Sequence, residues 1–100
     1  MLKLPNTFTA DGKLLHVVIE TPCASRNKYA FDPVTGLFKL RKILPARTEL
    51  PLDMGFIPGT LGDDGDPLDA VVWMDFPGST GVFLECRLFG RDGSDSARKK

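Results

Sequence analysis

The sequence lacks several features that would assign it to a class at once. It has no apolar run near the roughly 20 residues that cross a bilayer, and its first residues do not lead into a signal-peptide core. We therefore expect no membrane partner and a cytoplasmic location. It has one histidine and two isolated cysteines, Cys23 and Cys86. This inventory argues against a zinc site, which needs three or four ligands, and we expect both thiols to be buried and structural.

Lysine and arginine are missing from the middle of the chain. The 13 basic and 13 acidic side chains give a formal net charge of zero, which argues against a general affinity for nucleic acid. Residues 48–86 nevertheless hold eight acidic side chains and no Lys or Arg. Residues 1–47 hold eight basic and three acidic side chains, and residues 87–100 hold five and two. The acidic middle block is the feature that a functional interpretation has to explain.

Helical periodicity is also missing, and short apolar or alternating stretches take its place. The runs Leu14–Glu20, Leu68–Met74 and Val82–Phe89 predict strands. Asn27–Phe31 and Leu37–Leu40 flank a connection that holds the Pro and Gly of a hairpin loop. Because closure removes exposed sheet edges, five or six short strands without an amphipathic helix predict a mainly β fold, a small closed barrel.

We find no repeat and no linker, so residues 1–100 are expected to form a single domain. The polar and charged residues 92–100 are expected to be a flexible tail. The aromatic residues fall mostly on the apolar stretches, and we expect most of them in the core.

The most informative segment is Asp63-Asp64-Gly65-Asp66-Pro67-Leu68-Asp69, directly before an apolar run. Four carboxylates within seven residues repel one another unless a cation lies among them. The glycine allows a tight turn and the proline fixes the backbone after it. Together they can aim Asp64, Asp66 and Asp69 at one point, and Mg²⁺ prefers such oxygen ligands. From the residues alone, a solvated acidic loop is an equal alternative.

Further motifs surround this segment in a fixed order. They are Val17-Val18-Ile19-Glu20-Thr21-Pro22, Ser25-Arg26-Asn27-Lys28-Tyr29, Asp32-x-x-Thr35-Gly36-Leu37, Gly55-Phe56-Ile57-Pro58-x-Thr60-Leu61 and, after the acidic segment, Cys86-Arg87. The arrangement resembles the soluble (family I) inorganic pyrophosphatases over roughly residues 15–90, and the D-G-D-P-x-D element is close to diagnostic.

The resemblance implies a five-stranded, OB-like barrel with the active site in its mouth. It also implies Mg²⁺-dependent hydrolysis of pyrophosphate to two phosphates, in a cytosolic protein that is usually a homo-oligomer in bacteria. By position, Asp64 and Asp69 resemble metal ligands, with Asp69 bridging two metals. Asp66 resembles the acceptor of the proton from the attacking water, Glu20 an outer metal-site carboxylate, and Lys28 a ligand of the leaving phosphate.

Other expected positions depart from the family pattern. The phosphate-binding Arg is replaced by Lys42, with Arg41 just before it, and Lys lacks the bidentate geometry of Arg. A later Asp…Asp-x-Lys segment is compressed, with Asp95 as a stand-in metal ligand and Arg98 as a stand-in phosphate ligand.

Further departures remove polar groups and a whole element. The Glu that normally follows Lys-Tyr is Ala30, and Leu50 and Met54 replace two tyrosines. The family's C-terminal helix is absent, and we expect the barrel surface so exposed to favour self-association. These losses predict Mg²⁺ binding with weak or lost hydrolysis.

Two alternatives to an enzyme stay open. One is a non-catalytic relative that binds metal and a phosphate-bearing small molecule, which the departures favour. The other is a nucleic-acid-binding barrel, which the acidic middle block argues against because it would repel a phosphate backbone.

Overall fold

The computed structural model describes residues 4–63, 65–74, 77–88 and 96–99. Its strands, in chain order, are β1 (Leu15–Thr21), β2 (Asn27–Asp32), β3 (Leu37–Ile43), β4 (Asp53–Ile57), β5 (Leu68–Trp73), β6 (Phe83–Leu88) and β7 (Ser96–Lys99). The prediction of a mainly β fold is confirmed. No segment in the described ranges is a helix long and apolar enough to cross a bilayer.

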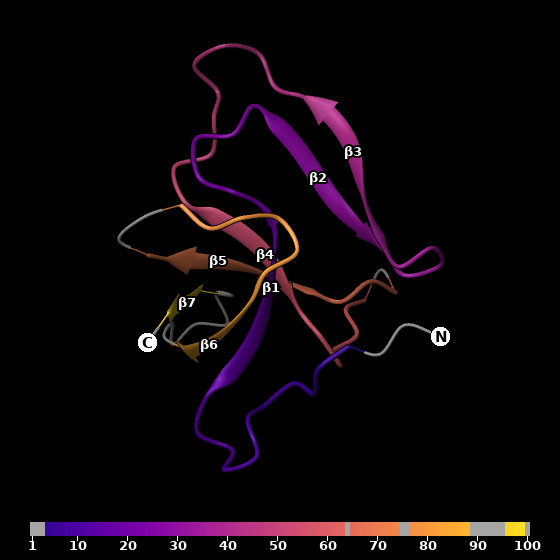
Figure 1. Cartoon of the computed structure of the whole chain (residues 1–100), viewed down its shortest axis with the longest axis vertical. Coiled ribbons are helices and arrows are strands. Elements are labelled where there is room, and N and C mark those ends of the chain that lie inside the picture. The colour runs from indigo at the N-terminus through magenta and orange to yellow at the C-terminus, as the bar shows by residue number, and fades with distance from the viewer. Residues whose placement is uncertain (1–3, 64, 75–76, 89–95, 100) are drawn as a thin grey trace.

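Five of the strands pair in a ring, and the other two form a separate hairpin. β1 pairs antiparallel with both β4 and β6, and β4 pairs antiparallel with β5. β7 lies between β5, to which it is parallel, and β6, to which it is antiparallel. β2 and β3 pair only with each other among the described strands. Figure 1 shows this hairpin standing apart from the ring, so the molecule has two sheets that can face one another.

The core lies inside the ring and follows from the alternation of β1. Leu15, Val17 and Ile19 of β1 all point inward, because side chains two residues apart share a face of a strand. The buried cluster is completed by Ile57, Ala70, Val72, Leu84 and Cys86. The expectation of a buried thiol is therefore confirmed for Cys86. Cys23 is only half-buried, and its thiol donates a hydrogen bond to the carbonyl of Pro51.

A buried carboxylate joins three separate segments next to this core. Asp53, at the start of β4, is 2% exposed. Its two carboxylate oxygens accept the backbone N–H of Cys23 at 2.5 Å and of Gly78 at 2.9 Å. The loop that contains Gly78 continues to Thr80, whose hydroxyl donates to the carbonyl of Glu20 at 2.8 Å. Asp53 thus ties the segment after β1 and the loop before β6 to β4.

The hairpin turn has the chemistry that its sequence predicts. The backbone N–H of Gly36 donates to the carbonyl of Asp32 at 2.8 Å, and Gly36 has φ +74°, which glycine adopts without strain. The Asp32 carboxylate accepts the N–H of Val34 at 2.9 Å, which lowers the pKa of that carboxyl below its ordinary value. Phe31 stacks on Phe56 of β4, with ring centroids 5.1 Å apart, and so connects the hairpin to the ring.

The expectation of a flexible tail covers residues 92–100, of which the structure describes Ser96–Lys99 as strand β7. The short polar segment has no alternating pattern of its own. Its strand conformation comes from pairing on both sides, with Ser96 opposite Val71 and Ala97 opposite Leu88. The other residues of the predicted tail lie outside the described ranges.

The prediction that most aromatic residues lie in the core also needs correction. Phe56 is buried, but Phe8, Trp73 and Phe83 are 53%, 48% and 55% exposed. The alternation of β5 explains Trp73, because Val72 points inward and the next side chain must point outward.

Candidate active site

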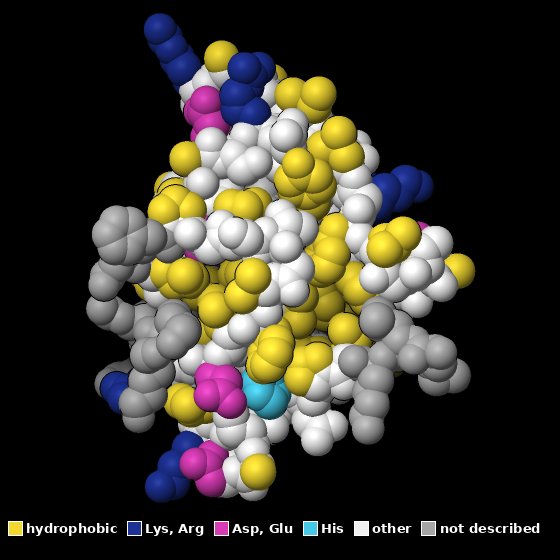
Figure 2. Space-filling model, in the orientation of Figure 1, with side chains coloured by type: hydrophobic (Ala, Val, Ile, Leu, Met, Phe, Trp, Pro, Cys, Tyr) yellow, Lys and Arg dark blue, Asp and Glu magenta, His cyan; other side chains and the backbone are white. Residues whose placement is uncertain are grey.

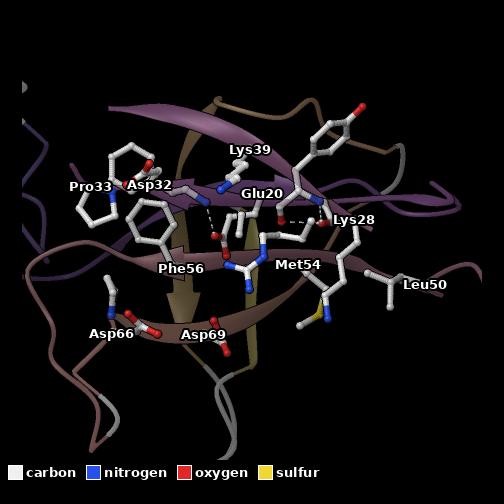
Figure 3. Close-up of a pocket in the computed structure, with 16 residues that line it drawn as sticks. Glu20, Lys28, Asp32, Pro33, Lys39, Leu50, Met54, Phe56, Asp66 and Asp69 are labelled. Carbon is white, nitrogen blue, oxygen red and sulfur yellow. Dashed lines mark hydrogen bonds between the residues drawn. The ribbon is translucent and has the colours of Figure 1, made fainter. Parts of the chain in front are cut away.

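A cavity of about 500 Å³ lies between the hairpin and the ring (Figure 3). Residues of β2 and β3 line one wall, and residues of β1, β4 and the start of β5 line the other. Four residues that the sequence predicted for the site line it together, namely Glu20, Lys28, Asp66 and Asp69. Its volume falls in the range of pockets that hold small molecules.

The acidic segment reaches the cavity through a tight turn. Gly65 has φ +87°, as expected for a glycine in a sharp turn. The N–H of Gly62 donates to the carbonyl of Asp66 at 2.6 Å and closes the loop. The Thr60 hydroxyl accepts the N–H of Leu68 at 2.9 Å and fixes the start of β5. These two hydrogen bonds shape the segment from which Asp66 and Asp69 reach the cavity.

Glu20 of β1 lines the same cavity as these two carboxylates. Its carboxylate accepts the backbone N–H of Phe31 at 2.7 Å. Burial raises the pKa of the Glu20 carboxyl, and the charges of Asp69 and Asp66 raise it further, against the opposing effects of the Phe31 N–H and Lys28. The like charges of Asp66 and Asp69 thus disfavour the ionised form of Glu20.

We expect Glu20→Gln to stabilise the metal-free protein at neutral pH. A carboxyl with a raised pKa contributes its stability below its unfolded pKa and loses it as the pH rises through the folded value. Without a cation, the ionised Glu20 is therefore unfavourable at pH 7.5, and Gln keeps the acceptor for Phe31. We expect the midpoint of thermal unfolding in EDTA to rise by about 2–4 °C at pH 7.5 and to be unchanged at pH 3.5. A lower midpoint for the variant at pH 7.5 would contradict this assignment.

The cationic side of the cavity differs from the prediction. Lys42 is exposed and does not line the cavity, whereas Arg41 and Lys39 do. Lys28 pairs with Lys42 while the next residue of β2 pairs with Leu40, so Arg41 is the extra residue of a β-bulge. The bulge supplies an arginine at the cavity, where the sequence predicted only a lysine. Lys39 carried no signal in the sequence beyond its charge.

Three predicted site residues have side chains outside the part of the chain that the structure describes. Asp64 and Asp95 lie outside the described ranges. Arg98 lies on β7, with its backbone opposite Trp73 and Arg87. Within the described ranges, no three His, Cys, Asp or Glu side chains form a group that could hold a metal ion alone.

Apolar side chains take the places of the expected polar groups. Ala30, Leu50 and Met54 all line the cavity. In Figure 3, Leu50 and Met54 lie toward Lys28, on the side opposite Asp66. The cavity therefore has an acidic end and an apolar end. Its cationic side chains, Lys28, Lys39 and Arg41, all come from the hairpin.

Comparison with known proteins assigns the chain to a family. A family model described as inorganic pyrophosphatase matches residues 17–91. The chain therefore belongs to the inorganic pyrophosphatase family. Among curated proteins, it is 47% identical over 78 residues to the inorganic pyrophosphatase of Thermus thermophilus, covering 78% of this chain and 45% of that protein. It is 49% identical over 74 residues to the one of Streptomyces coelicolor, covering 74% and 45%.

Solved structures agree with the sequence matches. The crystal structure of an inorganic pyrophosphatase from Neisseria gonorrhoeae gives a TM-score of 0.85 at 35% identity, covering 97% of this chain and 61% of that one. The one from Thermus thermophilus gives 0.84 at 38% identity, covering 97% and 60%. The chain spans about half the length of the curated relatives that it matches.

Proposed function

We propose that this chain binds Mg²⁺ and pyrophosphate and hydrolyses pyrophosphate to two phosphates. The ring of strands would be the closed OB-like barrel that the family resemblance implies, with the cavity at its mouth. The observation that carries the proposal is the cavity itself, where Glu20, Asp66 and Asp69 lie on the wall opposite Lys28 and Arg41. This division matches a substrate whose negative charges need both metal and protein cations.

The donor set suits a hard divalent cation. Glu20 and Asp69 offer only oxygen, which Mg²⁺ prefers over nitrogen and sulfur. Asp64 and Asp95 complete the proposed ligands from outside the described ranges. When bound, the metal lowers the pKa of water and neutralises phosphate charge.

The chain's own residues then have separate roles. Asp66 accepts the proton of the attacking water as the water oxygen bonds to phosphorus. The bridging P–O bond breaks, and the leaving phosphate keeps the electron pair beside Lys28. Arg41 binds phosphate oxygens through its planar guanidinium, in place of the role that the sequence suggested for Lys42. Arg98 stays a proposed phosphate ligand.

A non-catalytic relative is the second candidate. The presence of Ala30, Leu50 and Met54 in the cavity favours it, because these side chains cannot donate to phosphate. Arg41 would restore one charged contact to phosphate, which both candidates can use. The two candidates differ in whether the chain hydrolyses the pyrophosphate that it binds.

A phosphate-release assay separates the candidates. The full chain is incubated with pyrophosphate and Mg²⁺, and a parallel sample contains EDTA. Phosphate release that EDTA abolishes supports the enzyme. Calorimetric binding of methylenediphosphonate with Mg²⁺, but no release from pyrophosphate, supports the binding protein. Neither release nor binding would reject both.

We expect Arg41→Ala to weaken pyrophosphate binding far more than Lys42→Ala. A charge-assisted hydrogen bond contributes about 1.5–3 kcal/mol, so its loss weakens binding roughly 10- to 150-fold. Lys42 has a similar charge one residue away but lies outside the cavity lining, which makes it the matched control. The measurement is the Kd for methylenediphosphonate at fixed Mg²⁺. A larger loss for Lys42→Ala would restore the interpretation drawn from the sequence.

The homo-oligomer and the cytoplasmic location also stay proposals. Figure 2 shows apolar side chains over the middle of one face, with Lys and Arg toward its rim. An apolar centre with a polar rim is typical of protein interfaces. Light scattering at micromolar concentration tests self-association, and a monomeric mass would reject it.

A further inference from the structure

The apolar end of the cavity is poorly suited to bare pyrophosphate. Leu50 and Met54 are half-buried, and both line the cavity beside the cationic wall. The outer surface of pyrophosphate consists of charged oxygens. Placed against Leu50 and Met54, these oxygens would lose water and gain no donor, which is unfavourable.

The same surface suits a phosphate compound that carries an organic group. An apolar substituent placed on Leu50 and Met54 is buried from water, and no polar atom loses a hydrogen-bond partner. The neighbouring Ala30 leaves space where a longer side chain would stand. The cavity volume of about 500 Å³ is ample for two phosphoryl groups and a substituent of ring size.

The two ends of the cavity are far enough apart to bind the two parts of such a molecule separately. In Figure 3, Asp66 lies at one side of the cavity and Leu50 at the other, with Glu20 and Asp69 between them. Lys28 lies on the side of Leu50 and Met54. A phosphoryl chain that runs from the carboxylates to Lys28 therefore ends next to the apolar surface.

We propose that the cavity takes an organic diphosphate, with its phosphoryl groups between the carboxylates and the hairpin cations and its apolar substituent on Leu50 and Met54. The inference rests on the proposed function, because it places the phosphoryl groups in the same site. It adds the chemical class of ligand that the apolar end selects.

The test compares two ligands of equal charge. The monomethyl and monophenyl esters of methylenediphosphonate differ in apolar area and cannot be hydrolysed at the bridge. Their Kd values are measured by calorimetry with the full chain and Mg²⁺. We expect the phenyl ester to bind about 5- to 10-fold more tightly, as expected for an added apolar contact of about 40–55 Å².

Variants show whether Leu50 and Met54 cause the preference. We expect Leu50→Asn and Met54→Gln each to reduce the ratio of the two Kd values toward one. Leu40→Asn is the matched control, since Leu40 is 48% exposed on β3 and does not line the cavity. It should leave the ratio unchanged.

The outcomes separate the inference from the function on which it rests. Equal binding of the two esters, or tighter binding of the methyl ester, would overturn the inference while the phosphate site stands. The inference would also be overturned if Leu40→Asn removed the preference for the phenyl ester while Leu50→Asn and Met54→Gln kept it. Failure of both esters and of unsubstituted methylenediphosphonate to bind would reject the phosphate site itself.

Discussion

We expect Asp66→Asn to lower phosphate release from pyrophosphate by about 10²- to 10⁴-fold, the range expected when a positioned general base is lost. The amide has nearly the same shape as the carboxylate, but it cannot accept the proton of the attacking water. The backbone carbonyl of Asp66, which accepts the N–H of Gly62, is unaffected, so the closed turn is kept. The measurement is the initial rate of phosphate release at saturating pyrophosphate and Mg²⁺.

Asp63→Asn is the control for this experiment. Asp63 belongs to the same acidic segment and is exposed, but it does not line the cavity. We expect its rate to stay within about twofold of the unmodified chain, since surface substitutions of this kind have small effects. Binding of methylenediphosphonate should survive Asp66→Asn. A rate that Asp66→Asn leaves intact would remove this residue from the proposed mechanism.

The second large effect is on stability. Asp53→Ala removes the acceptor of two backbone N–H groups, those of Cys23 and Gly78, in a position that is 2% exposed. Each donor left without its acceptor costs about 1–3 kcal/mol, so we expect a loss of about 2–6 kcal/mol in the free energy of unfolding for the two together. This is a large part of the 5–15 kcal/mol that typically holds a domain together. Urea denaturation measures it.

Two variants make the result specific. Asp53→Asn keeps one acceptor oxygen and should give an intermediate loss, whereas Asp63→Ala at the exposed site should change stability by less than about 0.5 kcal/mol. Because the loop of Gly78 also holds Thr80 against the carbonyl of Glu20, Asp53→Asn should weaken Mg²⁺ binding as well. An Asp53→Ala variant as stable as the unmodified chain would show that the two N–H groups find other partners.

Much of the fold could be predicted from the sequence because its signals are local. The β-branched run around Val17, the hairpin loop with Gly36 and the apolar run before Trp73 each specify a strand or a turn within a few residues. Strand β7 could not be predicted in this way. Its residues become a strand because β5 and β6 both pair with them, and those partners are distant in the sequence.

The site residues also divide into those with a local sequence signal and those whose placement depends on distant strands. Asp66 and Asp69 belong to a dense local motif, and Glu20 and Lys28 were found through the family resemblance. Lys42 was preferred to Arg41 because it holds the position of the phosphate-binding Arg in the family pattern. The structure makes Arg41 the extra residue of a bulge opposite Lys28, and a bulge depends on the register with a partner strand. A position in a sequence motif does not contain that register.

The stacking of Phe31 on Phe56 has a mechanical consequence. The lysines and the arginine of the cavity lie on the hairpin together with Asp32, whereas Glu20, Asp66 and Asp69 lie on the ring or on the loop that leads into it, so the cavity lies between two sheets. The stack of Phe31 on Phe56 and the hydrogen bond from the Phe31 N–H to Glu20 hold these two sheets together. We expect a smaller side chain at position 31 to lower the proposed affinity for phosphate, although every charged group would stay in the chain.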